Sequence, residues 1–278
     1  MVIAYVDNRD EVWKKTFIDY CTKNNIRNKI AELHTERFED IGLINYQLKL
    51  INKHMPFINK IFLLLSNKEQ APKDLPSNVV VVLHEQFIPY RFRPTFNSCT
   101  IEMFLWNITE LSEYFIYAND DMLPFRDMKP SDFFSENGKV KINWYQQDIR
   151  DLGSMFRYQC LNSYQDVCKV LHMPIDKFHY IRPEHSFTPL VKSHCLEIFM
   201  KLKDNAFEHI RAFRTFYQYN QYIYPIYEHF RYGDMPSELD FLYTQLNEDI
   251  DLDHDIVCLN IVPQNKKKEI IKELEKRI

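Results

Sequence analysis

The sequence predicts an α/β fold in which a mostly parallel sheet is flanked by helices, followed by a largely helical second half. Three observations lead to this prediction. Strand and helix patterns alternate along the first half, the longest aliphatic runs are only strand-sized, and few strand patterns occur beyond about residue 145. Such alternation is typical of parallel sheets, because a helix usually covers each crossover. We place a boundary near residue 145, which gives an α/β core over 1–145 and a mainly helical part over 146–278. A single domain is the alternative.

Four segments of the first half have the composition of buried strands. Aliphatic, β-branched and aromatic residues dominate each of them, and polar residues follow where each one ends. The segments are Val2–Val6, Lys60–Ser66, Asn78–His84 and Tyr114–Met122. Ligands of open α/β sheets bind outside the carboxyl ends of the strands. The sequence therefore predicts a binding crevice at one sheet edge, formed by Asp7, Ser66, Asn67, His84, Glu85, Asp120 and Asp121.

Several segments show helical spacing of their apolar residues. Residues 10–24 and Asp40–His54 do so, and we interpret Cys99–Leu111 as a helix that leads into the last predicted strand. Phe216–Tyr232 holds eight Phe or Tyr at helical spacing, which favours core packing over the stacking of sugar rings. The basic amphipathic segment Lys266–Ile278 either docks on its own domain or rests on an anionic membrane surface.

The composition narrows the class of protein. The chain has 278 residues, a net charge of -4 and only 4 Gly. This charge gives no support to a nucleic-acid partner. The sequence contains neither GxGxxG nor GxxxxGK[ST], the glycine-rich patterns that cradle phosphates. A nucleotide diphosphate would therefore be held by a metal ion and by side chains.

The cellular location is predicted from cysteine usage and hydropathy. The 6 Cys show no zinc-ligand spacing, which favours reduced thiols in a reducing compartment. The chain starts directly with a strand-like segment, without a signal-peptide pattern. Its longest aliphatic stretches, Ile61–Leu65 and Val79–Leu83, are too short to span a bilayer. We expect a cytoplasmic protein, with peripheral contact at the inner face of the membrane through Lys266–Ile278 as an addition.

The adjacent carboxylates Asp120 and Asp121 are the first candidates for chemistry. They follow an apolar strand directly, with Asn119 beside them. A hard divalent cation such as Mg²⁺ is typically held by one or two carboxylates together with substrate phosphates. The alternative is a strand-to-turn boundary at which Asn and Asp merely supply turn chemistry.

His185 and Arg214 are further candidates. His185 lies in a loop-like, polar setting, and histidine is the common general base near neutral pH. A structural or merely exposed histidine is the alternative. Arg214 precedes the aromatic segment, and an arginine fork suits phosphate oxygens. A surface charge is the alternative for this residue.

Several blocks, taken together, resemble the Stealth family of sugar-phosphate transferases. The order and spacing of PTFNS, IE and the NDD strand carry most of the resemblance. The blocks are Tyr5–Trp13, Arg37–Asp40, Asn45–Lys49, Met55–Phe62, His84-Glu85, Pro94–Glu102, Leu111–Met122, Pro130–Phe134, Asn137-Gly138, His185–Lys192, Phe213-Arg214 and Val257–Asn260. Two departures stand out. Asn8 replaces a usual Gly, and Ile261 stands where an Asp commonly follows Asn260.

The resemblance implies a GT-A-like α/β core that binds a nucleotide sugar, with residues 146–278 completing the active site. It implies metal-dependent transfer of a hexose-1-phosphate from a nucleotide-diphosphate sugar, with UDP favoured, to a hydroxyl of a glycan or lipid-linked glycan acceptor. The product would be a phosphodiester of a capsular or cell-surface polysaccharide. The alternatives are an ordinary metal-dependent glycosyltransferase that releases a nucleoside diphosphate, and a catalytically silent glycan-binding relative.

The resemblance also implies roles for individual residues. Asp120 and Asp121 would hold Mg²⁺ or Mn²⁺, Arg214 would pair with a phosphate oxygen, and His185 would take the acceptor's proton. Asn97 and Glu102 would shape the donor pocket. The full set of predicted substrate-binding residues is Asp7, Asn8, Arg9, Asn97, Ser98, Glu102, Asn119 and Lys192.

Overall fold

The structure is a computed structural model that describes residues 1–34, 42–202, 204–244, 251–260, 262–263 and 265–278. A five-stranded sheet in the order β3-β2-β1-β4-β8 lies at its centre. Its strands are β1 (Val2–Ala4), β2 (Ile61–Leu65), β3 (Val79–Leu83), β4 (Tyr114–Asn119) and β8 (Thr188–Val191). The first four run parallel to their neighbours, and β8 pairs antiparallel with β4. The predicted α/β fold with a mostly parallel sheet is therefore confirmed.

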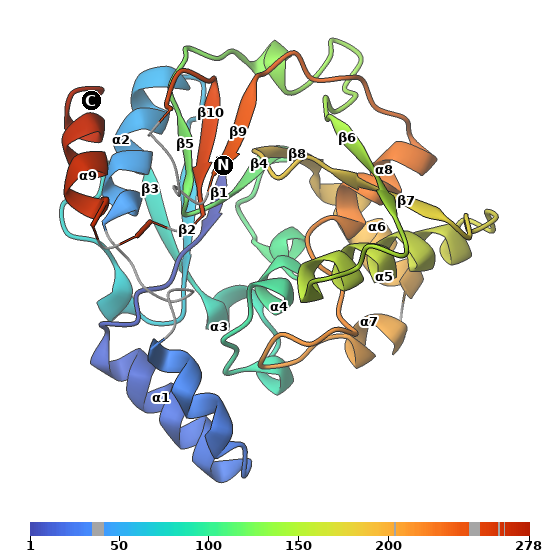
Figure 1. The fold of residues 1–278 in the computed structure, drawn as a ribbon, viewed down its shortest axis with the longest axis horizontal. Helices are drawn as coiled ribbons and strands as arrows, with labels where there is room; N and C mark the ends of the chain where they lie inside the picture. Colours follow the sequence, from blue (N-terminus) through green and yellow to red (C-terminus); the bar gives the residue numbers. More distant parts are fainter. Residues whose placement is uncertain (35–41, 203, 245–250, 261, 264) are drawn as a thin grey trace.

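Both faces of the sheet are buried, which explains the continuous aliphatic runs of its strands. Val2, Phe62 and Leu64 point into one core cluster, and Ile3 and Leu63 point into another. This alternation follows from the two-residue period of a strand. Figure 1 shows helix α2 (Leu43–His54) on one side of the sheet and helices α5 (Met155–Val170), α6 (Lys192–Leu202), α7 (Asp204–Glu208) and α8 (Ile223–Arg231) on the other.

The second half contains more strands than the sequence predicted. Besides β8, it forms β7 (His179–Pro183), which pairs antiparallel with β6 (Trp144–Asp148), and β9 (Phe241–Thr244) and β10 (Ile256–Leu259). Strand β10 pairs with both β9 and β5 (Met122–Pro124). All of these are short, and apart from the β9–β10 pair their pairing partners are distant in sequence. Residues 1–145 and 146–278 consequently share two sheets and the larger core cluster.

Two predicted helices were too long. Within Cys99–Leu111, helix α4 (Ser98–Glu102) ends early and a 3₁₀ turn, Leu105–Asn107, follows. Residues 99–105 are all buried, so this segment enters the core on every side instead of keeping a solvent face. Within Phe216–Tyr232, only Ile223–Arg231 is helical. Core packing is confirmed for Tyr219, Tyr222, Tyr224 and Tyr227, whereas Phe216 and Tyr217 are exposed.

The remaining predicted helices are present. Helix α1 (Glu11–Lys23) begins after Asp10, whose carboxylate accepts hydrogen bonds from the amides of Val12 and Trp13. Helix α2 begins at Leu43, and the preceding part of the predicted helix, with the Arg37–Asp40 block, lies outside the described residues.

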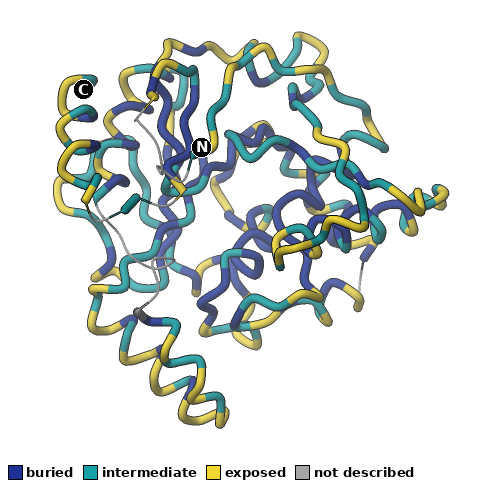
Figure 2. The backbone as a smooth tube through the Cα atoms, in the orientation of Figure 1, coloured by how far each residue is buried: buried dark blue, intermediate teal, exposed yellow. Residues whose placement is uncertain are grey.

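The basic C-terminal segment forms α9 (Lys267–Glu275), whose apolar side docks on its own chain. Ile270 and Leu274 are fully buried against Leu50 of α2 and Val257 of β10. Figure 2 shows the other side of this helix exposed. Over the described ranges, no helix combines the length and apolar composition needed to cross a bilayer.

Candidate active site

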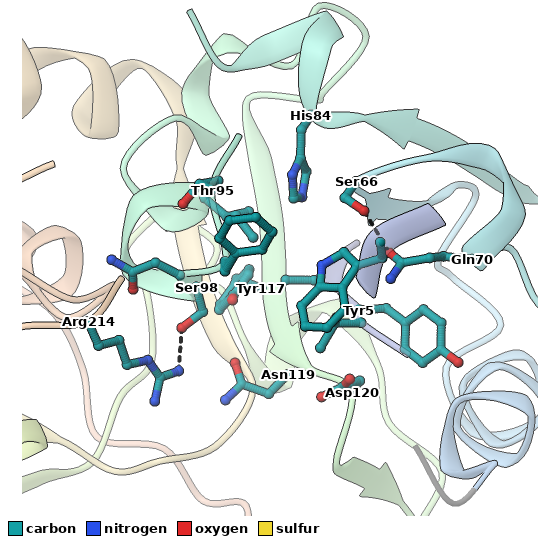
Figure 3. Close-up of a pocket in the computed structure, with 16 residues that line it drawn as sticks. Tyr5, Ser66, Gln70, His84, Thr95, Ser98, Tyr117, Asn119, Asp120 and Arg214 are labelled. Carbon is teal, nitrogen blue, oxygen red and sulfur yellow. Dashed lines mark hydrogen bonds between the residues drawn. The ribbon is translucent and has the colours of Figure 1, made fainter. Parts of the chain in front are cut away.

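A cavity of about 120 Å³ lies at the carboxyl ends of the four parallel strands. Tyr5 follows β1, Ser66 follows β2, His84 follows β3, Asn119 ends β4 and Asp120 follows it. Figure 3 shows Asn119 and Asp120 side by side in the cavity wall, with His84 across from them. The predicted crevice therefore exists, and it includes Ser66, His84 and Asp120. Asp7, Asn67, Glu85 and Asp121 do not line this cavity.

Aromatic rings and a neutral histidine form much of its wall. Trp13 of α1 and Phe96 line it, with ring centroids 5.7 Å apart. Burial, and to a lesser extent the charge of Arg93, lowers the pKa of His84 to about 4. Its Nε2 is buried and has no hydrogen-bond partner among the described residues. A neutral imidazole in this position can donate a hydrogen bond to a bound ligand or accept one from it.

We expect the buried neutral His84 to make stability depend on pH. Its pKa of about 4 lies below the ordinary 6.5, so the unfolded chain takes up the proton first as the pH falls. The contribution of neutral His84 to the unfolding free energy is therefore fully present above pH 6.5 and is lost as the pH falls toward 4. Between pH 7.5 and 5, His84 should lower the unfolding free energy of the natural chain by about 2 kcal/mol. In His84→Asn this part of the decrease should be absent. Denaturant unfolding of both proteins at the two pH values measures this difference. An unchanged pH dependence would contradict the expectation.

A second cavity, of about 610 Å³, adjoins the first. Ser98, Asn119 and Arg214 line both cavities and form the junction between them. The larger cavity receives residues mainly from the second half of the chain, including His185 and Arg182. The structure thus brings the predicted residues of both halves to one place.

Arg214 is held at the junction by α4. One Nη of Arg214 donates to Ser98 Oγ at 2.5 Å, as the dashed line in Figure 3 indicates. Its Nε is buried and has no hydrogen-bond partner among the described residues. Burial raises the pKa of the nearby Glu102, and the charge of Arg214 opposes that rise. A buried guanidinium N–H without an acceptor suits an anionic ligand.

The turn that carries Asp120 and Asp121 is clamped from two sides. Gln47 of α2 is fully buried, and its Nε2 donates to the carbonyls of Asn119 and Met122, each at 2.7 Å. On the other side, the amide of Leu259 in β10 donates to the main-chain oxygen of Asp121 at 2.8 Å. Both clamps use main-chain oxygens of the turn. These bonds hold the turn through its backbone and do not involve the Asp121 carboxylate.

The carboxylate of Asp121 is only partly satisfied by the protein. Asn260 Nδ2 donates to its Oδ2 at 3.4 Å, while its Oδ1 is buried without a hydrogen bond to any described residue. Burial, then the Asp121 charge and a side-chain hydrogen bond with Asp121, raise the pKa of the neighbouring Cys258 well above its usual range. In the part of the chain that the structure describes, no group of three His, Cys, Asp or Glu could hold a metal ion. An orphaned carboxylate oxygen beside a second carboxylate fits a cation whose other ligands come from a substrate.

His185 lies in the larger cavity between Tyr222 and Asn119. Its Nδ1 is 2.7 Å from the Tyr222 hydroxyl, and its Nε2 is 3.4 Å from Asn119 Nδ2. Burial lowers the pKa of His185, the charge of Asp121 opposes this, and Arg182 and Arg214 lower it further. Since the Asn119 amide nitrogen can only donate, Nε2 is the acceptor and Nδ1 carries the proton. The unprotonated Nε2 therefore faces the Asn119 side of the cavity.

The other predicted substrate-binding residues lie apart from both cavities or serve local structure. Asp7 forms a bidentate ion pair with Arg9, with the closest contact at 2.7 Å. Although burial opposes it, the Arg9 contacts keep the pKa of Asp7 below its usual range. Asn8 Nδ2 donates to the Leu33 carbonyl at 3.1 Å. Lys192 Nζ donates to the carbonyls of Ile108, Thr109 and Leu111. None of these four side chains lines either cavity.

Asn97 and Glu102 line the cavities but also hold α4 in place. The Asn97 side chain caps α4 at the Cys99 amide and donates to the Arg211 carbonyl and Gln218. Glu102 accepts from the Gln221 amide at 2.9 Å and from the Tyr117 hydroxyl at 3.3 Å. These bonds fix the segment that carries Arg214.

Sequence reasoning missed other residues that line or support the site. They are Trp13 and Arg182 in the walls, Gln47 behind the Asp120-Asp121 turn, and Tyr222 beside His185. Trp13 and Gln47 belong to the quoted Tyr5–Trp13 and Asn45–Lys49 blocks, which was the only available signal. Arg182 and Tyr222 had no signal, because their neighbours in space are distant in sequence.

Residues 37–142 match the family model described as Stealth protein CR2, conserved region 2. The chain belongs to the Stealth family. The matched region contains the Asp120-Asp121 turn, His84 and the α4 segment, and so most of the smaller cavity. His185 and Arg214 lie beyond it, in the part of this Stealth chain that forms the larger cavity. The fourth-block departure, Ile261, lies outside the described residues.

Curated relatives of this Stealth chain are named as polysaccharide phosphotransferases. An exopolysaccharide phosphotransferase of Lactiplantibacillus plantarum is 36% identical over 151 residues, which are 53% of this chain and 42% of the relative. Capsular polysaccharide phosphotransferases of Actinobacillus pleuropneumoniae and Neisseria meningitidis serogroup B are each 30% identical, over 208 and 204 residues. Both matches cover 69% of this chain and 53% of the relative. The chain thus spans about half the length of the curated relatives it matches.

Proposed function

We propose that this chain transfers a hexose-1-phosphate from a nucleotide-diphosphate sugar to a hydroxyl of a glycan acceptor. The observation that carries the proposal is the junction of two cavities, where Arg214 and Asn119 line both and the Asp120-Asp121 turn lies beside them. Two cavities suit a reaction between two substrates when they meet at a place where carboxylates can bind a cation and an arginine can bind an anion. The names of the curated relatives support the same chemistry in capsular polysaccharide synthesis.

The smaller cavity suits part of the donor nucleotide. Its aromatic walls can stack on a planar base, and the free Nε2 of His84 can bond to a polar edge of the base or to the ribose. A UDP-sugar is the favoured donor, and its planar uracil base could stack on these aromatic walls. The diphosphate would then lie at the junction, within reach of Arg214.

Asp120 and Asp121 would hold Mg²⁺ or Mn²⁺ with phosphate oxygens of the donor as further ligands. The unpartnered Oδ1 of Asp121 supports this assignment. When bound, the cation neutralises charge on the diphosphate and orients it. Because the described residues offer only two carboxylates there, we expect tight cation binding only together with a nucleotide diphosphate.

The residues at the junction can support phosphoryl transfer by positioning and charge neutralisation. The acceptor hydroxyl oxygen bonds to the phosphorus that carries the hexose. The bond from this phosphorus to the bridging oxygen breaks, and a nucleoside monophosphate leaves. His185 Nε2 takes the proton of the acceptor hydroxyl, while Arg214 stabilises the negative charge on the transferred phosphate. We place this reaction at the cytoplasmic side of the membrane, where glycan or lipid-linked glycan acceptors are built.

The identity of the nucleotide product tests the proposal. UDP-, GDP- and CMP-sugars would be incubated with the protein, Mg²⁺ or Mn²⁺ and a panel of capsular oligosaccharides, and the nucleotides separated by chromatography. Metal-dependent formation of a nucleoside monophosphate from a diphosphate sugar, together with a phosphodiester in the glycan, is expected. Formation of a nucleoside diphosphate would instead show an ordinary glycosyltransferase. No product with any donor and acceptor would indicate a silent glycan-binding relative.

A further inference from the structure

The mouth of the larger cavity exposes an unusual number of aromatic rings. Tyr145 of β6, Phe156 of α5 and Tyr243 of β9 line it with exposed fractions of 46%, 37% and 44%. The rings of Phe156 and Tyr243 lie 6.0 and 5.8 Å from the His185 ring. Large exposed rings cost free energy in water, so such a cluster commonly marks a binding surface. Amphipathic rings of this kind pack well against the apolar faces of sugar rings.

Arg182 of β7 lies among these rings, and no described residue is paired with it as an anion. Its guanidinium is 4.8 Å from the centre of the Tyr145 ring, and its Nε is buried without a hydrogen bond to any described residue. It forms no salt bridge within the described residues. The charge of Arg182 opposes the rise that burial causes in the pKa of Glu184. The Glu184 carboxylate accepts its hydrogen bonds from Tyr145 and Asn143.

Two neighbouring arginines, unlike Arg182, are paired with carboxylates. Arg157, which also lines the larger cavity, is paired with Asp151 at 2.5 Å. Arg150, which lines neither cavity, is paired with Asp148 at 2.6 Å. An arginine whose buried N–H lacks an acceptor costs free energy unless a ligand supplies one. Arg182 therefore points to an anionic group on whatever occupies this cavity.

The position of Arg182 indicates that the anion it binds is a different group from the phosphates of the donor. Arg214 lines both cavities at the junction, whereas Arg182 lines only the larger one. Resting on the proposed function, we infer that Arg182 and the aromatic rim form an acceptor subsite that selects a sugar carrying an anionic substituent, a phosphate or a carboxylate. The ring of the sugar packs on Tyr145, Phe156 or Tyr243, and its anionic group accepts hydrogen bonds from the Arg182 fork.

A binding experiment with simple sugars tests this subsite without turnover. The full chain is first saturated with UDP and diamagnetic Mg²⁺, so that the donor side is occupied. Glucose 6-phosphate, glucuronate and glucose are then titrated separately, and dissociation constants are obtained from saturation-transfer NMR. We expect at least one of the two anionic sugars to bind about tenfold or more tightly than glucose. Binding of the phosphate or of the carboxylate identifies the preferred group, and either result supports the subsite.

Variants test whether the preference for an anionic sugar depends on Arg182 and not on other surface charges. Arg182→Gln should abolish the preference for the anionic sugar, while Arg182→Lys, which keeps the charge without the fork, should retain part of it. Arg150→Gln is the matched control and should bind like the natural chain. An equal affinity for glucose, binding of the anionic sugar only when UDP is left out, or an unchanged preference in Arg182→Gln would each overturn the inference.

The outcome is independent of the test of the proposed function. If a nucleoside monophosphate is formed but anionic sugars show no preference, only the subsite is wrong. If anionic sugars bind through Arg182 but no donor is turned over, the subsite stands and the transfer reaction is wrong.

Discussion

Asp121→Asn should lower turnover by about 10³-fold or more while leaving the fold intact. The loss is expected because a divalent cation contributes several kcal/mol of charge stabilisation, and each 1.36 kcal/mol is a factor of ten in rate. The fold should survive, since the turn is held by Leu259 and Gln47 through main-chain oxygens and not through the carboxylate. Turnover is measured as nucleoside monophosphate formed at saturating donor, and the fold by circular dichroism and thermal unfolding. Asp121→Ala should behave in the same way.

The matched control for this variant is Asp127→Asn, which removes an exposed carboxylate that lines neither cavity. Its activity should equal that of the natural chain. A second readout follows the cation directly, because Mn²⁺ bound in the presence of UDP can be counted by electron paramagnetic resonance. Asp121→Asn should weaken that binding. Full turnover or unchanged Mn²⁺ binding in Asp121→Asn would exclude this carboxylate as a cation ligand.

His185→Gln should lower turnover by about 10²- to 10⁴-fold, the usual contribution of a general base. Gln keeps a polar group near Tyr222 and Asn119 but cannot take up a proton. The Michaelis constant for the donor should change little, because His185 lines only the larger cavity. A change confined to donor binding, with turnover preserved, would count against a role as base.

The pH profile gives a second test of His185. Burial keeps its pKa below the ordinary 6.5, so the base is unprotonated near neutral pH. Activity should therefore be flat at neutral pH and should fall only as the pH drops below 6.5. In the residual activity of His185→Gln this acid-side decrease should be absent. His179→Gln, at a histidine of β7 that lines neither cavity, should keep the natural profile.

The sheet and its functional edge could be predicted because both depend on local patterns. Ile61–Leu65 is apolar along its whole length, as expected for a short strand buried on both faces. Once four such strands are aligned in parallel, chain direction alone brings Ser66, His84 and Asp120 to one edge. These three predicted residues line the cavity for that reason, whereas Asp7, Asn67, Glu85 and Asp121 do not, and the Asp7 side chain turns to Arg9 instead.

The limits of local patterns appear at Cys99–Leu111 and Phe216–Tyr232. Both have apolar residues at helical spacing, yet each forms only one short α-helix. The remainder is held by bonds across long sequence distances, such as those from Asn97 to Arg211 and Gln218. Spacing along the chain contains no information about such partners, so tertiary contacts override helical propensity there.

The sequence by itself determined the α/β class, the parallel strands and the carboxylate pair at the end of β4, since these follow from residue types over a few positions. Only the tertiary structure decided that Arg214 meets Ser98, that His185 lies between Tyr222 and Asn119, and that Lys192 is bound to three main-chain carbonyls. It also decided that Arg182 forms no salt bridge with any described residue. The physical reason is that a side chain's charge and hydrogen bonds are balanced by its neighbours in space, which for these residues are distant in the chain.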